Sequence, residues 1–165
     1  MTAQENRSGM SSTKDTTANS GINERIAITG RLQLFIDGVQ VADHANKVTL
    51  LGCTALMQGW MGAAGYGIAT WEGGTGTTAP TTADTALQIS TYGPAAVSTA
   101  SVTGSTTMEV TFQITPAMGE PDQDFAEFGL FCSNGDLFAR WCDGNTYNYT
   151  AGATLLGVWT FTFTL

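Results

Sequence analysis

Short stretches of alternating apolar and polar residues run along most of this chain, and this pattern is typical of half-buried β-strands. The most regular stretches are residues 25–36, 107–114 and 158–165. Gly30 suggests a bulge in the first of them. Their apolar faces consist of Ile26, Ile28, Leu32, Leu34 and Ile36, then Met108, Val110, Phe112 and Ile114, then Trp159, Phe161, Phe163 and Leu165.

Turn signals separate these strands from further short apolar runs. Asp37-Gly38 and residues 133–136, which contain Asn-Gly, predict hairpins. Further strands are expected at residues 66–71, 87–89, 97–102, 125–131 and 137–141, with a turn at 92–94 and a loop over 143–153. About eight short strands with little helix indicate an all-β protein, a β-sandwich of the jelly-roll type.

One helix is predicted, over about residues 47–62. Apolar residues follow three- and four-residue steps at Val48, Leu51, Ala55 (or Leu56) and Gly59. Asn46 is the expected N-cap, and the glycines from Gly62 onward end the pattern. The wide apolar surface of this helix predicts burial against the sheet or against a neighbouring subunit.

The first residues form a different kind of segment. Residues 1–21 are polar and have no apolar period, so they cannot build a core of their own. We interpret residues 1–24 as an extended polar arm that docks on neighbouring subunits, and residues 25–165 as the β-sandwich body. The length of 165 residues suits one domain plus such an extension.

Charge separates the two parts of the chain further. Residues 1–47 carry five acids and five bases, whereas residues 48–165 carry nine acids and one base, Arg140. An acidic body opposes nucleic-acid binding, which requires Lys and Arg, and suits a solvated surface or a basic partner. No run approaches the roughly 20 apolar residues of a membrane span. The polar N-terminus has no apolar signal core, so we expect no secretion.

Three cysteines, Cys53, Cys132 and Cys142, give an odd count without a CxxC spacing, which argues against a disulfide framework or a zinc site. Cys132 and Cys142 flank one predicted hairpin, so a bond across it is the alternative. Reduced core cysteines are the favoured interpretation for a protein assembled in the cytosol.

A glycine-rich stretch, residues 71–87, organises the chain, and its residues 74–79 match the GxGxxA spacing of dinucleotide-binding turns. That chemistry needs a helix whose N-terminus holds the pyrophosphate. Pro80-Thr81-Thr82 follows instead, without an apolar helical face. We therefore predict a shaped loop that joins two parts of the sandwich.

Other candidate residues have more ordinary interpretations. His44, the only histidine, lies in a polar turn, so a surface position is expected over a role in Ser-His or Cys-His catalysis. Four carboxylates in eight residues suggest calcium ligands or, more simply, a solvated acidic loop. They are Glu120, Asp122, Asp124 and Glu127.

Aromatic residues near loops form the last candidate site, a surface for stacking on sugars. Its members are Trp71, Trp141, Tyr147 and Tyr149, although core positions are commoner for such residues. Glycosylation sequons at Asn6 and Asn148 carry little meaning without a secretion signal. We predict no catalytic, cofactor-binding or metal-ligating residues, and no cofactor.

Three stretches in this order resemble a widespread group of tailed-bacteriophage virion structural proteins. They are GTGTTAPTTADTAL (74–87), AEFGLF…GDLFAR (126–140) and TLLGVWTFTF (154–163). The resemblance covers roughly residues 47–165. Members of the group are labelled tail, fibre, head-fibre or decoration proteins, and the group offers no catalytic residues to transfer.

The resemblance implies a non-enzymatic virion component that is assembled in the host cytoplasm. The preferred role is a capsid decoration or cement protein whose partners are the major capsid protein or other virion proteins. A homo-oligomer is expected, with a trimer favoured by analogy. The alternative is a tail, neck or fibre-attachment protein, and a glycan-binding module or enzyme is the third class. Binding to nucleic acid or membrane is not expected.

Overall fold

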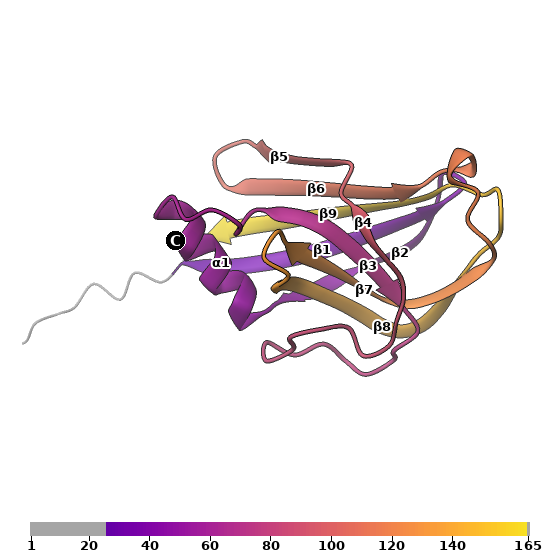
Figure 1. Cartoon of the computed structure of the whole chain (residues 1–165), viewed down its shortest axis with the longest axis horizontal. Coiled ribbons are helices and arrows are strands. Elements are labelled where there is room, and N and C mark those ends of the chain that lie inside the picture. Colours follow the sequence, from indigo (N-terminus) through magenta and orange to yellow (C-terminus); the bar gives the residue numbers. More distant parts are fainter. Residues whose placement is uncertain (1–25, 165) are drawn as a thin grey trace, which may run out of the picture.

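The computed structural model describes residues 26–164, which form one curled antiparallel sheet and one α-helix (Figure 1). The elements are β1 (Ala27–Ile36), β2 (Val39–Val48), α1 (Leu50–Trp60), β3 (Ile68–Gly74), β4 (Ser90–Ala96), β5 (Thr99–Thr103), β6 (Thr107–Ile114), a 3₁₀ turn (Pro116–Met118), β7 (Gln123–Cys132), β8 (Leu137–Tyr149) and β9 (Leu155–Thr164). The predicted all-β class with one helix is confirmed. The predicted arm (residues 1–24) and Leu165 lie outside the described residues.

The nine strands follow the order β4-β3-β7-β8-β2-β1-β9-β6-β5, with antiparallel neighbours throughout. The sheet curls so that the β3-β7-β8 half faces the β1-β9-β6 half, as in a sandwich (Figure 1). Strand β2 joins the two halves. It pairs along β1 but meets β8 only at Lys47 and Val48.

Aromatic side chains fill the space between the two halves. Trp71 of β3 stacks on Phe112 of β6 with ring centroids 4.3 Å apart. Phe138 of β8 meets Phe161 of β9 edge-on at 5.1 Å. These four rings are buried, and aromatic rings contribute both large apolar area and specific geometry to a core. The apolar face predicted for residues 107–114 points into this core.

The hairpin predicted at Asp37-Gly38 joins β1 to β2. Both residues have positive φ, 49° and 77°, as the favoured two-residue hairpin turn requires. The register shift in β1 lies between Leu34 and Phe35, so the bulge suggested at Gly30 is not there. Gly30 instead leaves room for Asn46, because a Cβ on it would lie 2.0 Å from the Asn46 Oδ1 atom.

The helix begins later than predicted, at Leu50, because β2 continues through Val48 and keeps Asn46 in the strand. Thr49 is the N-cap. Its buried hydroxyl accepts a hydrogen bond from the Gly52 amide at 2.9 Å and donates one to the Leu137 carbonyl. No helix among the described residues combines the length and the apolarity that crossing a membrane requires.

Replacing Thr49 with alanine is expected to lower the free energy of unfolding by about 1–2 kcal/mol, because the cap is lost. Urea denaturation followed by circular dichroism measures the change. Thr49→Ser keeps the hydroxyl and serves as the control. A serine variant as unstable as the alanine variant would contradict the capping role.

Three local predictions are wrong where pairing with distant strands decides the structure. Residues 92–94 lie inside β4 and form no turn, with a cis Gly93–Pro94 peptide bond. Pro94 is tolerated because β4 ends the sheet order, and such edge strands admit proline. Residues 87–89 form no strand. Residues 143–149, predicted as loop, continue β8 opposite the start of β7.

Candidate functional site

The segment between β3 and β4, residues 75–89, is here called the Gly-Thr loop. It packs on the outer face of β7 and β8, which is the face turned away from the main core (Figure 1). Leu87 packs there against Phe131 and Leu137 in a small second apolar cluster. The loop also reaches α1, since the Leu50 amide donates to the Thr82 carbonyl at 2.8 Å. The two strands are therefore covered on both faces, and long parts of each are buried without alternation.

A fully buried carboxylate, that of Glu127 in β7, holds both ends of this loop. Its Oε1 atom accepts hydrogen bonds from the amides of Gly76 at 3.1 Å and Ile89 at 2.7 Å. Its Oε2 atom accepts one from the amide of Gln88 at 3.0 Å. The prediction that Glu127 belongs to a solvated acidic loop is wrong, because the strand points it under the Gly-Thr loop.

Arg140 in β8 is the counter-ion of this carboxylate, and its side chain is only 3% exposed. Nη2 lies 2.7 Å from Glu127 Oε2, and Nη1 lies 2.8 Å from Asp84 Oδ2. Nη2 also donates to the Thr78 carbonyl at 3.1 Å. Burial acts to raise the pKa of Glu127. The backbone amides of Ile89 and Gln88, together with Arg140, outweigh burial and hold this pKa below its ordinary value.

The glycines of the GxGxxA motif permit close approach. A Cβ on Gly74 would lie 2.1 Å from the Ile89 carbonyl oxygen, and one on Gly76 would lie 2.3 Å from Glu127 Oε1. No helix follows them, and residues 75–89 are loop. The predicted loop is confirmed, and its glycines make room for neighbouring protein atoms. The prediction that it joins two parts of the sandwich is wrong, because it connects β3 to its paired neighbour β4.

The remaining candidates from the sequence do not converge on one site. His44 is an exposed residue in β2, 3.5 Å from an Asp143 oxygen, so its predicted surface position is confirmed. Asp122 accepts a hydrogen bond from the Ala151 amide, and Asp124 accepts one from the Asn148 side chain. Over residues 26–164, no three His, Cys, Asp or Glu side chains are grouped as a metal ion would require.

The suggested sugar-stacking surface is wrong for three of its four aromatic residues. Trp71, Trp141 and Tyr149 are buried in the core. Tyr147 is partly buried, and its hydroxyl donates to an Asp143 oxygen at 2.5 Å. Rings that pack on other core side chains leave no free face for a sugar.

The thiols of Cys132 and Cys142 are free, as favoured from the sequence. The β7–β8 register places Cys142 opposite Glu127, whereas Cys132 lies at the far end of β7 beside the turn. The two residues are therefore not cross-strand partners. Burial, aided by the charge of Asp136, raises the pKa of Cys132 to about 11.

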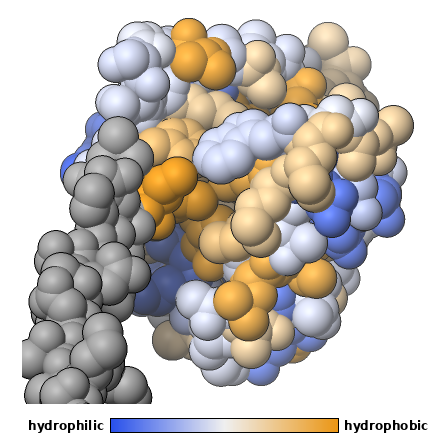
Figure 2. Space-filling model, turned by 90° about the vertical axis from the view of Figure 1, so that its left-hand side faces the viewer, coloured by the Kyte–Doolittle hydropathy of each residue, from blue (hydrophilic) through white to orange (hydrophobic). Residues whose placement is uncertain are grey.

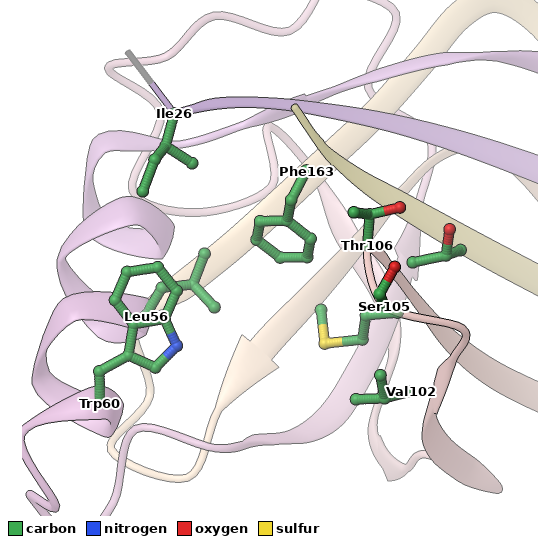
Figure 3. Close-up of a pocket in the computed structure, with 9 residues that line it drawn as sticks. Ile26, Leu56, Trp60, Val102, Ser105, Thr106 and Phe163 are labelled. Atoms are coloured by element: carbon green, nitrogen blue, oxygen red, sulfur yellow. The ribbon is translucent and has the colours of Figure 1, made fainter. Parts of the chain in front are cut away.

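Exposed apolar side chains collect at one end of the sandwich, where the last turns of α1 face the β5–β6 hairpin (Figure 2). Trp60 is 67% exposed and Val102 is 75% exposed. Between them lies an open pocket of 370 Å³, here called the end pocket (Figure 3). It is lined by Ile26, Leu56, Trp60, Val102, Ser105, Thr106, Thr107, Met108 and Phe163, none of which carries a charge.

A second pocket, of 430 Å³, is also lined by Ile26 and is here called the Asn46 pocket. Asn46 is only 8% exposed, and neither its Nδ2 nor its Oδ1 atom has a hydrogen-bond partner among the described residues. Buried polar groups are nearly always hydrogen-bonded, so this carboxamide calls for a partner. Cys53 of α1 and Thr82 of the Gly-Thr loop contribute to the same pocket.

Sequence reasoning missed the Glu127–Arg140 pair, although a signal was present. Arg140 is the one base among residues 48–165 and follows Phe138 and Ala139 directly. A lone charge inside an apolar run is seldom buried unless it is paired, so the run itself predicts an acidic partner. The end pocket had a weaker signal, in the Met and Trp residues of the predicted helix.

No family model, curated protein or solved structure matches this chain.

Proposed function

We propose that this protein is a non-enzymatic structural component of a tailed-phage virion, with a capsid decoration or cement protein as the preferred role. The proposal rests on the three stretches that resemble such proteins. The first two meet in the fold, because Glu127 and Arg140 of the second hold the Gly-Thr loop of the first. Phe161 of the third packs on Phe138 of the second. The three resembling stretches therefore pack against one another in the fold. This packing is the observation that supports the proposal.

The surface supports a role in subunit contacts. Three of its exposed apolar residues, Ile26, Trp60 and Val102, line a pocket without charged lining residues. The centre of a protein interface is typically depleted of charge and enriched in Trp and Met. The proposed partners are the major capsid protein and further copies of this chain, with a homotrimer favoured. The alternative role remains a tail, neck or fibre-attachment protein.

Counting copies in purified virions by quantitative mass spectrometry tests the position on the particle. A decoration protein is expected in hundreds of copies, because it follows the symmetry of the shell. A count of about six, about twelve or a few dozen would favour the neck or tail, which have lower cyclic symmetry. Absence from the particle would overturn the proposal altogether.

Deleting residues 1–24 is expected to abolish binding to the shell while the body keeps its thermal midpoint. The reason is that the proposed arm makes the contacts, whereas the core lies within residues 26–164. Co-sedimentation with undecorated capsids and a thermal scan give the two readouts. Normal binding by the truncated protein would refute the docking role of the arm.

A further inference from the structure

We propose that the end pocket and the Asn46 pocket receive the N-terminal segment, residues 1–25, of a second copy of this chain. This inference rests on the arm role within the proposed function and names the surface by which the arm would also join neighbouring copies of this chain on the shell. Three independent features of the described residues support it: the place where the segment begins, the polarity of the two pockets, and the distribution of charge.

The segment starts at the pockets themselves. Ile26, the first described residue, lines both of them, and Figure 3 shows its side chain at the end pocket. An extended chain advances about 3.3 Å per residue, so 25 residues reach about 80 Å. A segment anchored here is therefore long enough to reach the same end of an adjacent copy.

The polarity of the pockets matches this segment better than it matches a broad apolar partner. Residues 1–25 are polar, with isolated larger apolar side chains at Met1, Met10 and Ile22. The end pocket offers space for one such side chain beside the hydroxyl groups of residues 105–107. The Asn46 carboxamide beside the second pocket has a buried donor and a buried acceptor without partners, and a peptide unit supplies the complementary pair when this side chain turns toward the pocket.

Charge favours the segment over the body of the second copy. Residues 26–164 carry eleven acids and three bases, whereas residues 1–25 carry three of each. Two bodies of net charge −8 repel each other. The neutral segment is the part of a second copy that approaches the pockets without this repulsion, and its own bases can meet the acidic body.

Disulfide trapping between two differently tagged, co-produced full-length chains tests the proposal. One chain carries Ile22→Cys and the other Val102→Cys, both with Cys53→Ser so that only the buried native thiols remain. Mild oxidation is expected to link the two chains. The matched control places the second cysteine at Val39, a 65% exposed valine that begins β2. The turn between β1 and β2 lies at the opposite end of the sandwich from α1 (Figure 1). Linkage there is expected to be at least tenfold lower.

A chain that carries both Ile22→Cys and Val102→Cys separates the alternatives. A bond within one chain, with no linked pair of chains, would overturn the proposal, because the segment would then cover its own pocket. No bond of either kind would overturn it as well. These crosslinks are measured in purified protein, whereas the proposed function is tested by the copy number in virions. A failure of this inference can therefore be told apart from a failure of the proposed function.

Self-association provides a second measurement, without introduced cysteines. Val102→Asp places a charge at the end pocket and is expected to weaken association at least tenfold in sedimentation velocity. Val39→Asp makes the same change on another exposed strand valine and is expected to have no effect. Unchanged association of the Val102→Asp protein, folded by circular dichroism, would contradict the proposal.

Discussion

Replacing Arg140 with methionine is expected to lower the free energy of unfolding by about 3–5 kcal/mol at pH 7, the usual cost of removing one partner of a buried ion pair. The guanidinium is buried against Glu127 and Asp84 and also holds the Thr78 carbonyl. Without it, the Glu127 carboxylate stays buried with only backbone donors. Chemical denaturation monitored by tryptophan fluorescence gives the value.

The control is Arg31→Met, which breaks the Arg31–Asp43 pair on the surface. The Arg31 side chain is 62% exposed, so its loss is expected to change stability far less. Equal losses for the two arginine variants would refute a special role for the buried pair. Adding Glu127→Gln to Arg140→Met is expected to recover part of the loss, because the stranded charge is then removed.

The cost of losing Arg140 should also depend on pH. In the native protein the pKa of Glu127 is lowered, so its contribution is present above the unfolded pKa of about 4.3 and is lost as pH falls below it. In the Arg140→Met protein, burial acts with less opposition and moves this pKa upward. The folded variant then takes up a proton at a higher pH than the folded native protein does. The stability difference between the two proteins is therefore expected to shrink between pH 7 and pH 4.

Replacing Gly157 with alanine is expected to cost about 2–3 kcal/mol, a cost typical of overpacking a core. A Cβ on Gly157 of β9 would lie 2.1 Å from the Phe112 Cζ atom. The Phe112 ring has little room to move, since it is fully buried and stacked on Trp71. Gly59→Ala is the matched control. No atom lies within 4 Å of that Cβ, and alanine favours the helix.

A double-mutant cycle with Phe112→Leu tests the cause. If the collision with the ring explains the cost, Gly157→Ala should cost less in the Phe112→Leu background than in the native one. Additive losses at these two touching residues would show that the ring is not responsible, and that the strand backbone of β9 resists the change for another reason.

The sequence predicted those parts of the fold that local rules decide. Residues 107–114 alternate, and Asp37-Gly38 suits a two-residue turn, so neither needed knowledge of a partner. Residues 143–149 and Pro94 were wrongly predicted as loop and turn. Their residue types do not favour a strand, and they are in strands because they pair with neighbouring strands. The buried position of Glu127 depends on Arg140, which faces it only after the β7–β8 hairpin has formed.

The end pocket could be predicted from the sequence even less well. Its residues come from Ile26 just before β1, from α1, from the β5–β6 hairpin and from the end of β9. The helix was expected to bury its apolar surface against a sheet or a neighbour. In the structure Ala55 is buried while Trp60 and Met61 are exposed, so the described residues account for only part of that apolar surface.

One carboxylate that holds three amides has a consequence for local opening of the Gly-Thr loop. The amides of Gly76, Gln88 and Ile89 lie near the two ends of the loop but share Glu127 as their acceptor. Lifting one end removes hydrogen-bond donors from a carboxylate that the other end still covers, so neither end is expected to open alone. The loop is then expected to open as a single cooperative unit, in which hydrogen exchange of these three amides reports one common opening free energy.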